Sequence, residues 1–337
     1  MKSYKNITLR NSKHFIRKFR DMLEINTNLL RGRSYIPNFR EQISLEFTSL
    51  CNLKCEFCAY QVKTSPKVTM SYEFFEKIIN QIGSMGFSSL SLTPCTGDIF
   101  MDKNIIKKLN FLEKFPQIKQ YGFFTNFILP GKKEIKELLD KNKFSTFAIS
   151  IYGHDLSSFQ KLSNGNENSY NRLVNNLSLL HDLLIMSKEK KFIWIGIRSY
   201  DFLQHSTIFN NSNSLLDIIK KLEENCDARI DILSNYNNWG GLLDKEKLSS
   251  IGINIIDGNL VYHKGACARI FYSVQIMADG RVNACSCRDA NVTLCIGDLK
   301  KNHLSYILSD ENPLYMNLIK AQESNNFPKV CVNCDFY

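Results

Sequence analysis

Residues 51–58 read Cys51-Asn52-Leu53-Lys54-Cys55-Glu56-Phe57-Cys58, and this run constrains the fold more tightly than any other in the chain. Its cysteines are separated by three and then two residues, and they follow an apolar segment at residues 43–47 that is typical of a β-strand. A [4Fe–4S] cube is usually held by four thiolates, so three thiolates in one loop leave one iron open to a small ligand. The spacing therefore predicts an open-iron cluster after the first strand.

Two other interpretations of the triplet are weaker. Structural zinc takes four closed ligands, and no histidine or further cysteine lies within thirty residues of Cys58. A disulfide would leave one of the three thiols unpaired. The N-terminus, residues 1–5, also lacks the apolar core of a secretion signal.

The triplet resembles that of the radical S-adenosylmethionine (SAM) superfamily, in which Phe57 would occupy the usual aromatic position before the third cysteine. The resemblance implies that the open iron binds SAM through its methionine end. One electron from the cluster would then break a C–S bond and give a 5′-deoxyadenosyl radical. It also implies that a flavodoxin or ferredoxin supplies that electron.

Strand-like and helix-like segments alternate from residue 42 to about residue 240. Continuous apolar strands are typical of a parallel sheet covered by helices. Six units are too few for a full eight-unit barrel, so we expect an α/β fold, a partial (β/α)6 barrel with catalytic groups at the carboxyl ends of its strands. The predicted strands are residues 43–47, 88–92, 120–124, 146–151, 192–197 and 229–233, and the predicted helices are residues 72–85, 104–115, 133–141, 170–188 and 215–224.

The pattern changes after Asn237-Asn238-Trp239-Gly240-Gly241, where short strand-like pieces and a hairpin signal at residues 278–280 begin. We expect a small α+β domain at 242–337 after the barrel at 42–241. Residues 1–41 are expected to form a basic helical extension, because ten Lys/Arg and two Asp/Glu fall within residues 1–40 and the apolar positions of 14–30 have loosely helical spacing.

Composition excludes several classes of protein. The 337 residues carry a net charge of +10, but no basic and aromatic pattern favours nucleic acid. No apolar run reaches the ~18 residues that a membrane span needs. We therefore expect a cytoplasmic protein without a transmembrane segment, whose eleven cysteines bind metal rather than form disulfides.

A second group of cysteines lies near the end of the chain. Cys267 and Cys285 form a C-x12-G-x4-C element, and Cys331-Val332-Asn333-Cys334 follows. By spacing alone these thiolates could hold a second [4Fe–4S] cluster or a zinc ion. The element resembles the opening of SPASM domains, and the shorter twitch form implies one auxiliary cluster on Cys267, Cys285, Cys331 and Cys334. Cys287 or Cys295 could replace Cys285, or both could be buried thiols.

The resemblance also places SAM contacts at the strand ends. Thr96-Gly97-Asp98 follows the second strand, where the superfamily has a Gly-Gly-Glu-like motif that contacts the SAM amino group. Gly97 would allow close backbone approach, although an ordinary turn is the alternative. Thr125-Asn126 resembles a Thr-Asn-Gly element, with Phe127 in place of the glycine, and Ser150 resembles a serine that contacts the ribose or carboxylate.

Four further residues are candidates for the reaction itself. Arg198 ends the fifth strand and is placed to pair with a carboxylate or phosphate, or else forms a surface ion pair. Trp239 could stack on a substrate ring or cap the barrel. Cys95 and Cys226 belong to neither cysteine group, so either thiol could return a hydrogen atom to a substrate radical, although a small packed cysteine is commoner.

Three outcomes follow for a substrate radical. An auxiliary cluster that takes an electron would give a ketone, as in twitch enzymes like 2-deoxy-scyllo-inosamine dehydrogenase, so we expect oxidation of a small polar, sugar- or cyclitol-like alcohol. A thiol that returns hydrogen would make a carbohydrate epimerase.

Peptide modification is less favoured, because only about forty residues precede the first strand. A pure electron carrier is disfavoured, since such proteins close all four ligands. The basic charge allows an anionic or nucleotide-linked substrate.

Overall fold

The computed structural model describes residues 42–187, 191–199, 204–233, 236–255 and 265–335, with isolated positions between residues 19 and 36. The predicted N-terminal extension, including its helix at residues 14–30, lies outside the continuously described residues. Within the described ranges, no helix combines the length and the apolar character needed to cross a membrane.

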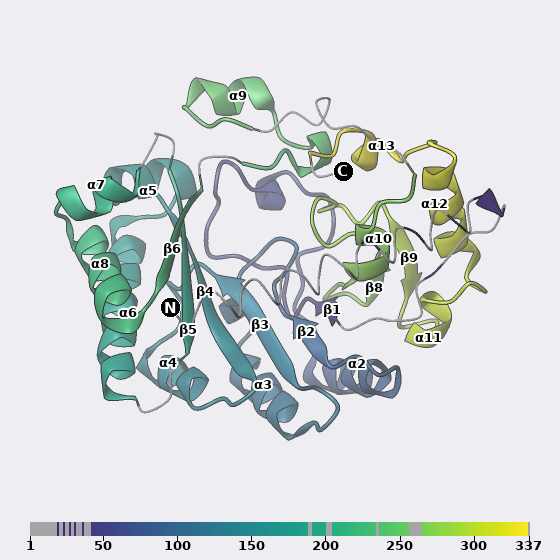
Figure 1. The fold of residues 1–337 in the computed structure, drawn as a ribbon, viewed down its shortest axis with the longest axis horizontal. Coiled ribbons are helices and arrows are strands. Elements are labelled where there is room, and N and C mark those ends of the chain that lie inside the picture. Colours follow the sequence, from purple (N-terminus) through teal and green to yellow (C-terminus); the bar gives the residue numbers. More distant parts are fainter. Residues whose placement is uncertain are drawn as a thin grey trace.

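The core of the fold is a parallel sheet of six strands, as predicted from the apolar runs. Adjacent strands in the order β6-β5-β4-β3-β2-β1 are hydrogen-bonded and parallel (Figure 1). They form the predicted partial barrel, and its strands end at the same edge. The strands are β1 (Gln42–Leu45), β2 (Ser89–Ser91), β3 (Gln120–Thr125), β4 (Phe144–Tyr152), β5 (Phe192–Arg198) and β6 (Arg229–Leu233).

Helices cover the outer face of this sheet (Figure 1). In α2, the Ser71 hydroxyl accepts a hydrogen bond from the Phe74 N–H at 3.2 Å, a cap worth about 1 kcal/mol. The helix ends just before Gly86, whose φ of +80° suits glycine. The helices that join the six strands are α2 (Tyr72–Ser84), α3 (Ile105–Lys114), α4 (Lys132–Leu139), α5 (Leu156–Ser163), α6 (Glu167–Met186), α7 (His205–Asn210) and α8 (Ser214–Cys226).

The C-terminal part extends the same sheet. The predicted hairpin at residues 278–280 is confirmed, since β7 (Gln275–Ile276) and β8 (Arg281–Asn283) are antiparallel. β9 (Cys295–Asp298) follows β8, while β7 pairs in parallel with β1. The sheet therefore runs without a break from the barrel into the predicted α+β region; the division at residue 241 stays a prediction. The remaining helices are α9 (Lys245–Ser250), α10 (Arg269–Tyr272), α11 (Leu304–Ile307), α12 (Pro313–Glu323) and α13 (Lys329–Val332), with 3₁₀ turns η1 (Ala59–Gln61), η2 (Ile99–Met101) and η3 (Trp239–Gly241).

Candidate active site

The cysteine loop, residues 51–58, follows β1, and all three of its cysteines line a large cavity. Two of its backbone N–H groups are bound by the end of α5. Lys54 donates to the Ser163 carbonyl at 3.1 Å, and Glu56 donates to the Leu162 carbonyl at 3.0 Å. Carbonyls in the last turn of a helix lack partners within the helix, so α5 holds the loop in its open shape.

Phe57 fixes the loop from inside the barrel. Its ring centroid lies 5.1 Å from that of Tyr152 and 4.7 Å from that of Tyr236. Its carbonyl oxygen accepts a hydrogen bond from Trp239 Nε1 at 3.0 Å. Phe57 is therefore buried among aromatic rings, and the Trp239 ring lines the cavity while its N–H holds the loop.

Gly97 allows the loop that follows β2 to contact the cysteine loop closely. The Asp98 N–H donates to the Leu50 carbonyl at 2.8 Å, directly before Cys51. Gly97 has a φ of +129°, and a Cβ added there would lie 2.7 Å from the Leu50 oxygen. The close approach predicted for Gly97 is thus an approach to the chain's own backbone.

Replacing Gly97 with alanine will loosen the cysteine loop. The new Cβ must displace backbone atoms and adopt a disfavoured φ, at a cost of about 2–4 kcal/mol. We expect a lower urea midpoint and less iron bound per chain. Gly86→Ala is the matched control, because its φ is +80° but nothing lies within 4 Å of the added Cβ. Equal losses in the two variants would contradict the role of the contact.

Asp98, Thr125 and Asn126, all predicted as cofactor contacts, form one buried network. One Asp98 oxygen, Oδ2, accepts from the Thr125 hydroxyl and the Asn126 N–H, each at 2.8 Å, while Oδ1 accepts from the Phe100 N–H at 3.0 Å. The Asn126 amide donates to the Asn52 side chain in the cysteine loop at 2.9 Å. The network orders the ends of β2 and β3 around the loop.

Phe127 follows this network and replaces the glycine of the family motif. Its φ of +59° lies in the left-handed region, which explains why glycine is favoured there. Its fully buried ring meets Phe147 edge to face at 6.2 Å. Burial of the ring offsets the backbone strain of roughly 1–3 kcal/mol.

Two buried polar atoms in the cavity wall have no hydrogen-bond partner among the described residues. They are the Thr96 hydroxyl and Arg198 Nε. Ser150 lies on the same inner face, one step below Tyr152, which pairs with Arg198 across β4 and β5. Unpaired buried donors are costly, so this cluster of polar groups indicates a polar ligand.

Burial keeps the thiols of the loop protonated unless a metal binds. It raises the pKa of Cys51 to about 12 and also raises the pKa values of Cys55 and Cys58. Backbone N–H groups of Leu53 and Tyr60 lie 3.5 Å from the sulfurs of Cys51 and Cys58. Such N–H groups stabilise thiolates at an iron–sulfur cluster, so the donor set fits the predicted cluster.

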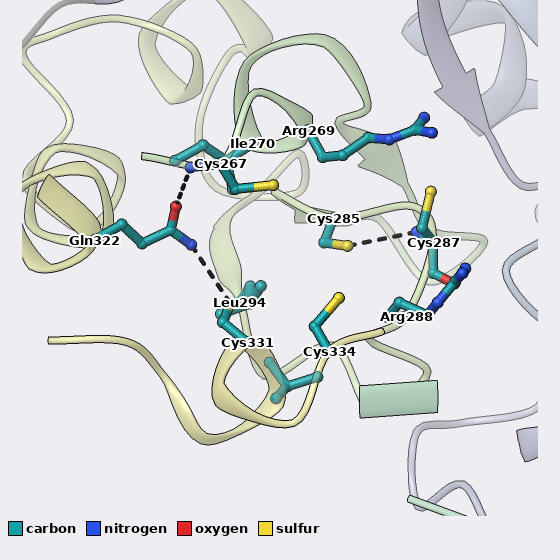
Figure 2. A pocket seen from close by; sticks show the side chains of 11 residues that line it. Cys267, Arg269, Ile270, Cys285, Cys287, Arg288, Leu294, Gln322, Cys331 and Cys334 are labelled. Carbon is teal, nitrogen blue, oxygen red and sulfur yellow. Dashed lines mark hydrogen bonds between the residues drawn. The ribbon is translucent and has the colours of Figure 1, made fainter. Parts of the chain in front are cut away.

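The second cysteine group surrounds a cavity of its own (Figure 2). Burial raises the pKa of Cys285 to about 11 and those of Cys267 and Cys331 to about 12. Tetrahedral zinc would hold four sulfurs about 3.8 Å apart. Among the described residues, no group of three or more His, Cys, Asp or Glu is arranged to hold a single metal ion. The four lining cysteines that were predicted as ligands are Cys267, Cys285, Cys331 and Cys334.

The remaining cysteines near this cavity differ from Cys285. The Cys287 N–H lies 3.5 Å from the Cys285 sulfur, and its own sulfur points away from the other sulfurs in Figure 2. The Cys295 thiol donates to the Gly297 carbonyl at 3.3 Å and does not line the cavity. This arrangement favours Cys285 as the ligand. None of the eleven cysteines, all within the described residues, forms a disulfide.

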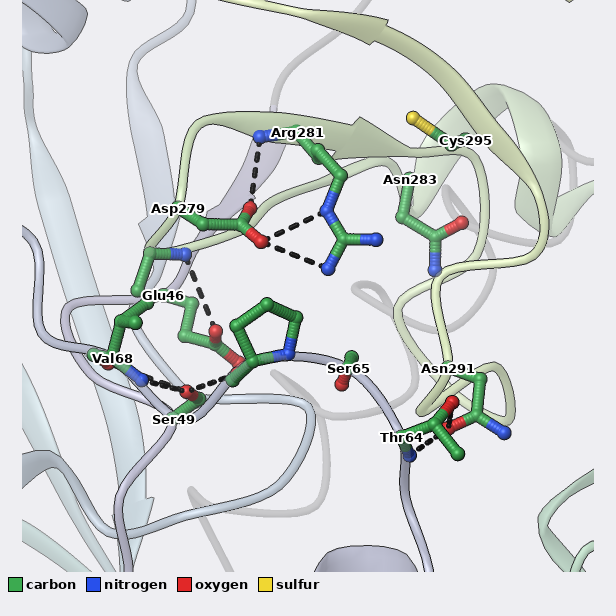
Figure 3. A network of polar contacts seen from close by, with 12 residues as sticks. Glu46, Ser49, Thr64, Ser65, Val68, Asp279, Arg281, Asn283, Asn291 and Cys295 are labelled. Atoms are coloured by element: carbon green, nitrogen blue, oxygen red, sulfur yellow. Dashed lines mark hydrogen bonds and ion pairs between the residues drawn. The ribbon is translucent and has the colours of Figure 1, made fainter.

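Glu46 connects the two sites, and sequence reasoning missed it. Directly after β1, its carboxylate accepts from the Cys95 N–H at 3.1 Å. It also accepts from the Ala278 N–H at 3.2 Å, directly before Asp279 (Figure 3). Burial raises the pKa of Glu46 to about 7, against the nearby Lys63 ammonium. The signal that could have found it is an acidic residue within the apolar segment 43–47.

The segment after the cysteine loop makes further contacts across the same boundary (Figure 3). The Thr64 N–H donates to the Asn291 side-chain oxygen, and the Ser65 hydroxyl donates to the Ala290 carbonyl, each at 2.7 Å. Residues 290 and 291 closely follow Cys285. Direct hydrogen bonds therefore join the segment after the cysteine loop to the segment after Cys285.

The two candidate thiols lie in different places. Cys95 lines the larger cavity, and the Cys285 thiol is among the groups that act on it electrostatically. Cys226 is the last residue of α8, directly before β6, so it lies at the amino-terminal end of the strands. It lines neither cavity.

Two family models match parts of this chain. The model of the radical SAM superfamily matches residues 45–198. A second model, an iron–sulfur cluster-binding domain named SPASM, matches residues 267–335. The chain contains a radical SAM domain. Its second match confirms the predicted SPASM/twitch subgroup, while no curated protein matches the chain.

Solved structures share the fold of this radical SAM protein at low sequence identity. BtrN in complex with AdoMet and 2-DOIA has a TM-score of 0.54 and 16% identity, over 88% of this chain and 93% of that chain. Streptococcus suis SuiB bound to the precursor peptide SuiA has a TM-score of 0.58 and 15% identity, over 89% and 72%. Native anSMEcpe with bound AdoMet has a TM-score of 0.52 and 16% identity, over 87% and 88%.

The family match confirms the predicted cofactors, which are a [4Fe–4S] cluster with an open iron, SAM and an auxiliary iron–sulfur cluster. The thiols of the cysteine loop and the unpaired donors of Thr96 and Arg198 fit the first two. The second cysteine cavity fits the third. Which individual side chains bind each cofactor stays a prediction.

Proposed function

We propose that this radical SAM enzyme oxidises an alcohol of a small polar, sugar- or cyclitol-like substrate to a ketone, and that the auxiliary cluster takes one electron. The observation that carries the proposal is the position of Cys95, which lines the first cavity. The Cys285 thiol of the second cysteine group contributes electrostatically to the raised pKa of Cys95, so the two groups lie within electrostatic range of each other. An electron acceptor on Cys285 would thus stand close to a substrate radical.

The oxidation balances without another oxidant. When bound, the open-iron cluster and SAM supply the 5′-deoxyadenosyl radical, which removes a hydrogen atom from the alcohol carbon. The auxiliary cluster, which Cys267, Cys285, Cys331 and Cys334 would hold, would then take one electron from the carbon radical, and the hydroxyl would release its proton. The substrate loses two electrons and two protons in total, which makes a C=O bond.

The side chains of the cavity favour a polar ring as substrate. The rings of Trp194 and Phe124 meet edge to face at 5.3 Å and line the inner wall. The Trp194 ring lies across Gly196, where a Cβ would come within 2.1 Å of it, so glycine leaves room for the ring. Arg198 supplies a guanidinium for a hydroxyl, carboxylate or phosphate. These groups suit a sugar-like ligand, including one that carries a negative charge.

Epimerisation is the second candidate, and the position of Cys95 favours it. A thiol in the cavity wall is placed to return a hydrogen atom to a substrate radical. Cys226 is not retained for this role, because it lies outside both cavities. Peptide modification is a further possible outcome of the test, because one of the similar structures, that of SuiB, is bound to a precursor peptide.

A screen of sugars and cyclitols for substrate-stimulated 5′-deoxyadenosine release tests the proposal. We expect equal amounts of 5′-deoxyadenosine and ketone. Cys331→Ala should still release 5′-deoxyadenosine but should lower ketone formation about 100-fold, because the electron acceptor is lost. Cys295→Ala is the matched control, since that thiol lies outside the cavity.

Other products would contradict the proposal in recognisable ways. Solvent deuterium at a product carbon, lost in Cys95→Ala, would show epimerisation instead. Turnover with peptides alone would show peptide modification. For the electron supply we propose a flavodoxin or ferredoxin in the cytoplasm, and purified donors can be tested in place of a chemical reductant.

A further inference from the structure

Gln322 joins two of the cysteines around the auxiliary cavity. It lies in the last turn of α12 and is fully buried. Its side-chain oxygen accepts from the Cys267 N–H at 2.8 Å, and its side-chain nitrogen lies 3.4 Å from the Cys331 sulfur (Figure 2). One amide therefore spans two segments that are distant in the sequence.

The hydrogen-bond network fixes the direction of this amide. A backbone N–H can only donate, so the oxygen of Gln322 must face Cys267. The NH₂ group then faces Cys331, where it donates to the sulfur. Hydrogen bonds to cluster sulfurs stabilise the more negative, reduced state and so raise the reduction potential of a cluster.

Two arginines, Arg269 and Arg288, also line the cavity. The Arg288 charge is paired, because its Nε donates to the buried Asp335 carboxylate at 2.5 Å. An N–H directed at a ligand sulfur acts at shorter range than such a paired charge. Gln322 is thus well placed to change the reduction potential of a cluster in this cavity.

We propose that Gln322 is a positioning residue of the auxiliary cluster, which holds Cys267 and Cys331 in place and raises the reduction potential of the cluster. This inference rests on the proposed function, in which the cluster must accept an electron from the substrate. The buried amide of Gln322 would thus affect both the positions of two cluster ligands and the tendency of the cluster to accept an electron.

Two substitutions separate these effects. Gln322→Glu keeps an acceptor for the Cys267 N–H but removes the donor to Cys331, and Gln322→Met removes both bonds. Gln81→Glu is the matched control, because the Gln81 oxygen also accepts a buried backbone N–H, that of Leu304 at 2.8 Å, away from the cavity.

The readouts are iron content and an EPR-monitored redox titration of the full-length holoenzyme without substrate. Added SAM perturbs only the open-iron signal, which identifies the auxiliary one. We expect Gln322→Glu to lower the equilibrium constant for one-electron reduction about tenfold, which is about 59 mV. Gln322→Met should shift the potential in the same direction, and Gln81→Glu should leave it unchanged.

Each outcome decides the inference. Loss of the auxiliary iron in a Gln322 variant, with full iron in Gln81→Glu, supports the positioning role. Full iron and an unshifted potential in both Gln322 variants would overturn the inference, as would an equal shift in Gln81→Glu. Because the titration needs no substrate, a shifted potential together with no ketone would refute only the proposed function.

Discussion

Replacing Cys55 with alanine will abolish reductive cleavage of SAM. Cys55 is the central and most buried thiol of the loop, at 6% exposure, and its neighbours are held by α5. An open-iron cluster has only three protein ligands, so the loss of one leaves no stable cube. We expect 5′-deoxyadenosine release to fall at least about 1000-fold, well beyond the loss caused by an outer residue.

The measurement is 5′-deoxyadenosine after anaerobic reconstitution with a strong reductant, together with iron per chain. Iron should fall from about eight to about four, because the auxiliary site remains intact. Cys226→Ala makes the same substitution outside both cavities and should change neither value. Retained cleavage activity in Cys55→Ala would refute the assignment of the radical cluster to this loop.

Replacing Lys108 with methionine will destabilise the barrel by about 3–5 kcal/mol. Lys108 is fully buried, and its Nζ lies 2.6 Å from Asp102 and 2.7 Å from the Met70 carbonyl. Methionine fills similar space but leaves the Asp102 carboxylate buried without its cation. Because Asp102 also accepts the Asn104 N–H at 2.8 Å before α3, the start of that helix should loosen.

Urea unfolding of the apo-protein under reducing conditions measures this cost through the shift of the midpoint. The control is Lys107→Met, one residue away in α3. The Lys107 side chain is exposed, with its Nζ 3.6 Å from the centre of the Tyr72 ring, so its loss should cost at most about 1 kcal/mol. Similar midpoints for the two variants would show that the buried pair contributes nothing.

The sequence predicted the barrel because each long strand carries its own apolar run. Residues 229–233 were predicted as a strand and form β6, and residues 72–85 were predicted as a helix and contain α2. The sequence prediction did not delimit α5 as a separate helix, although it did predict α4, which has the same length. β7 has two residues and pairs with a distant strand, so no local pattern could predict that pairing.

The site was predictable where the chemistry needs ligands close together in the chain. The cysteine loop satisfies that condition, and the family match confirmed the cluster that its spacing predicted. Glu46 and Gln322 were missed because their roles depend on contacts with distant segments. A single buried amide or carboxylate belongs to no spacing pattern that one sequence could show.

The pairing of β1 with β7 has a consequence for engineering and for electron transfer. Ser44 and Leu45 are hydrogen-bonded in register with Gln275 and Ile276 only a few residues before the cysteine loop. Electron tunnelling between redox centres depends steeply on their separation. Here the backbone hydrogen bonds between β1 and β7 help to fix the separation of the two cysteine sites. The C-terminal part therefore cannot be removed without consequence, because its removal would expose β1 as an edge strand that is prone to aggregation. A C-terminal part taken from another protein would have to supply a strand in place of β7.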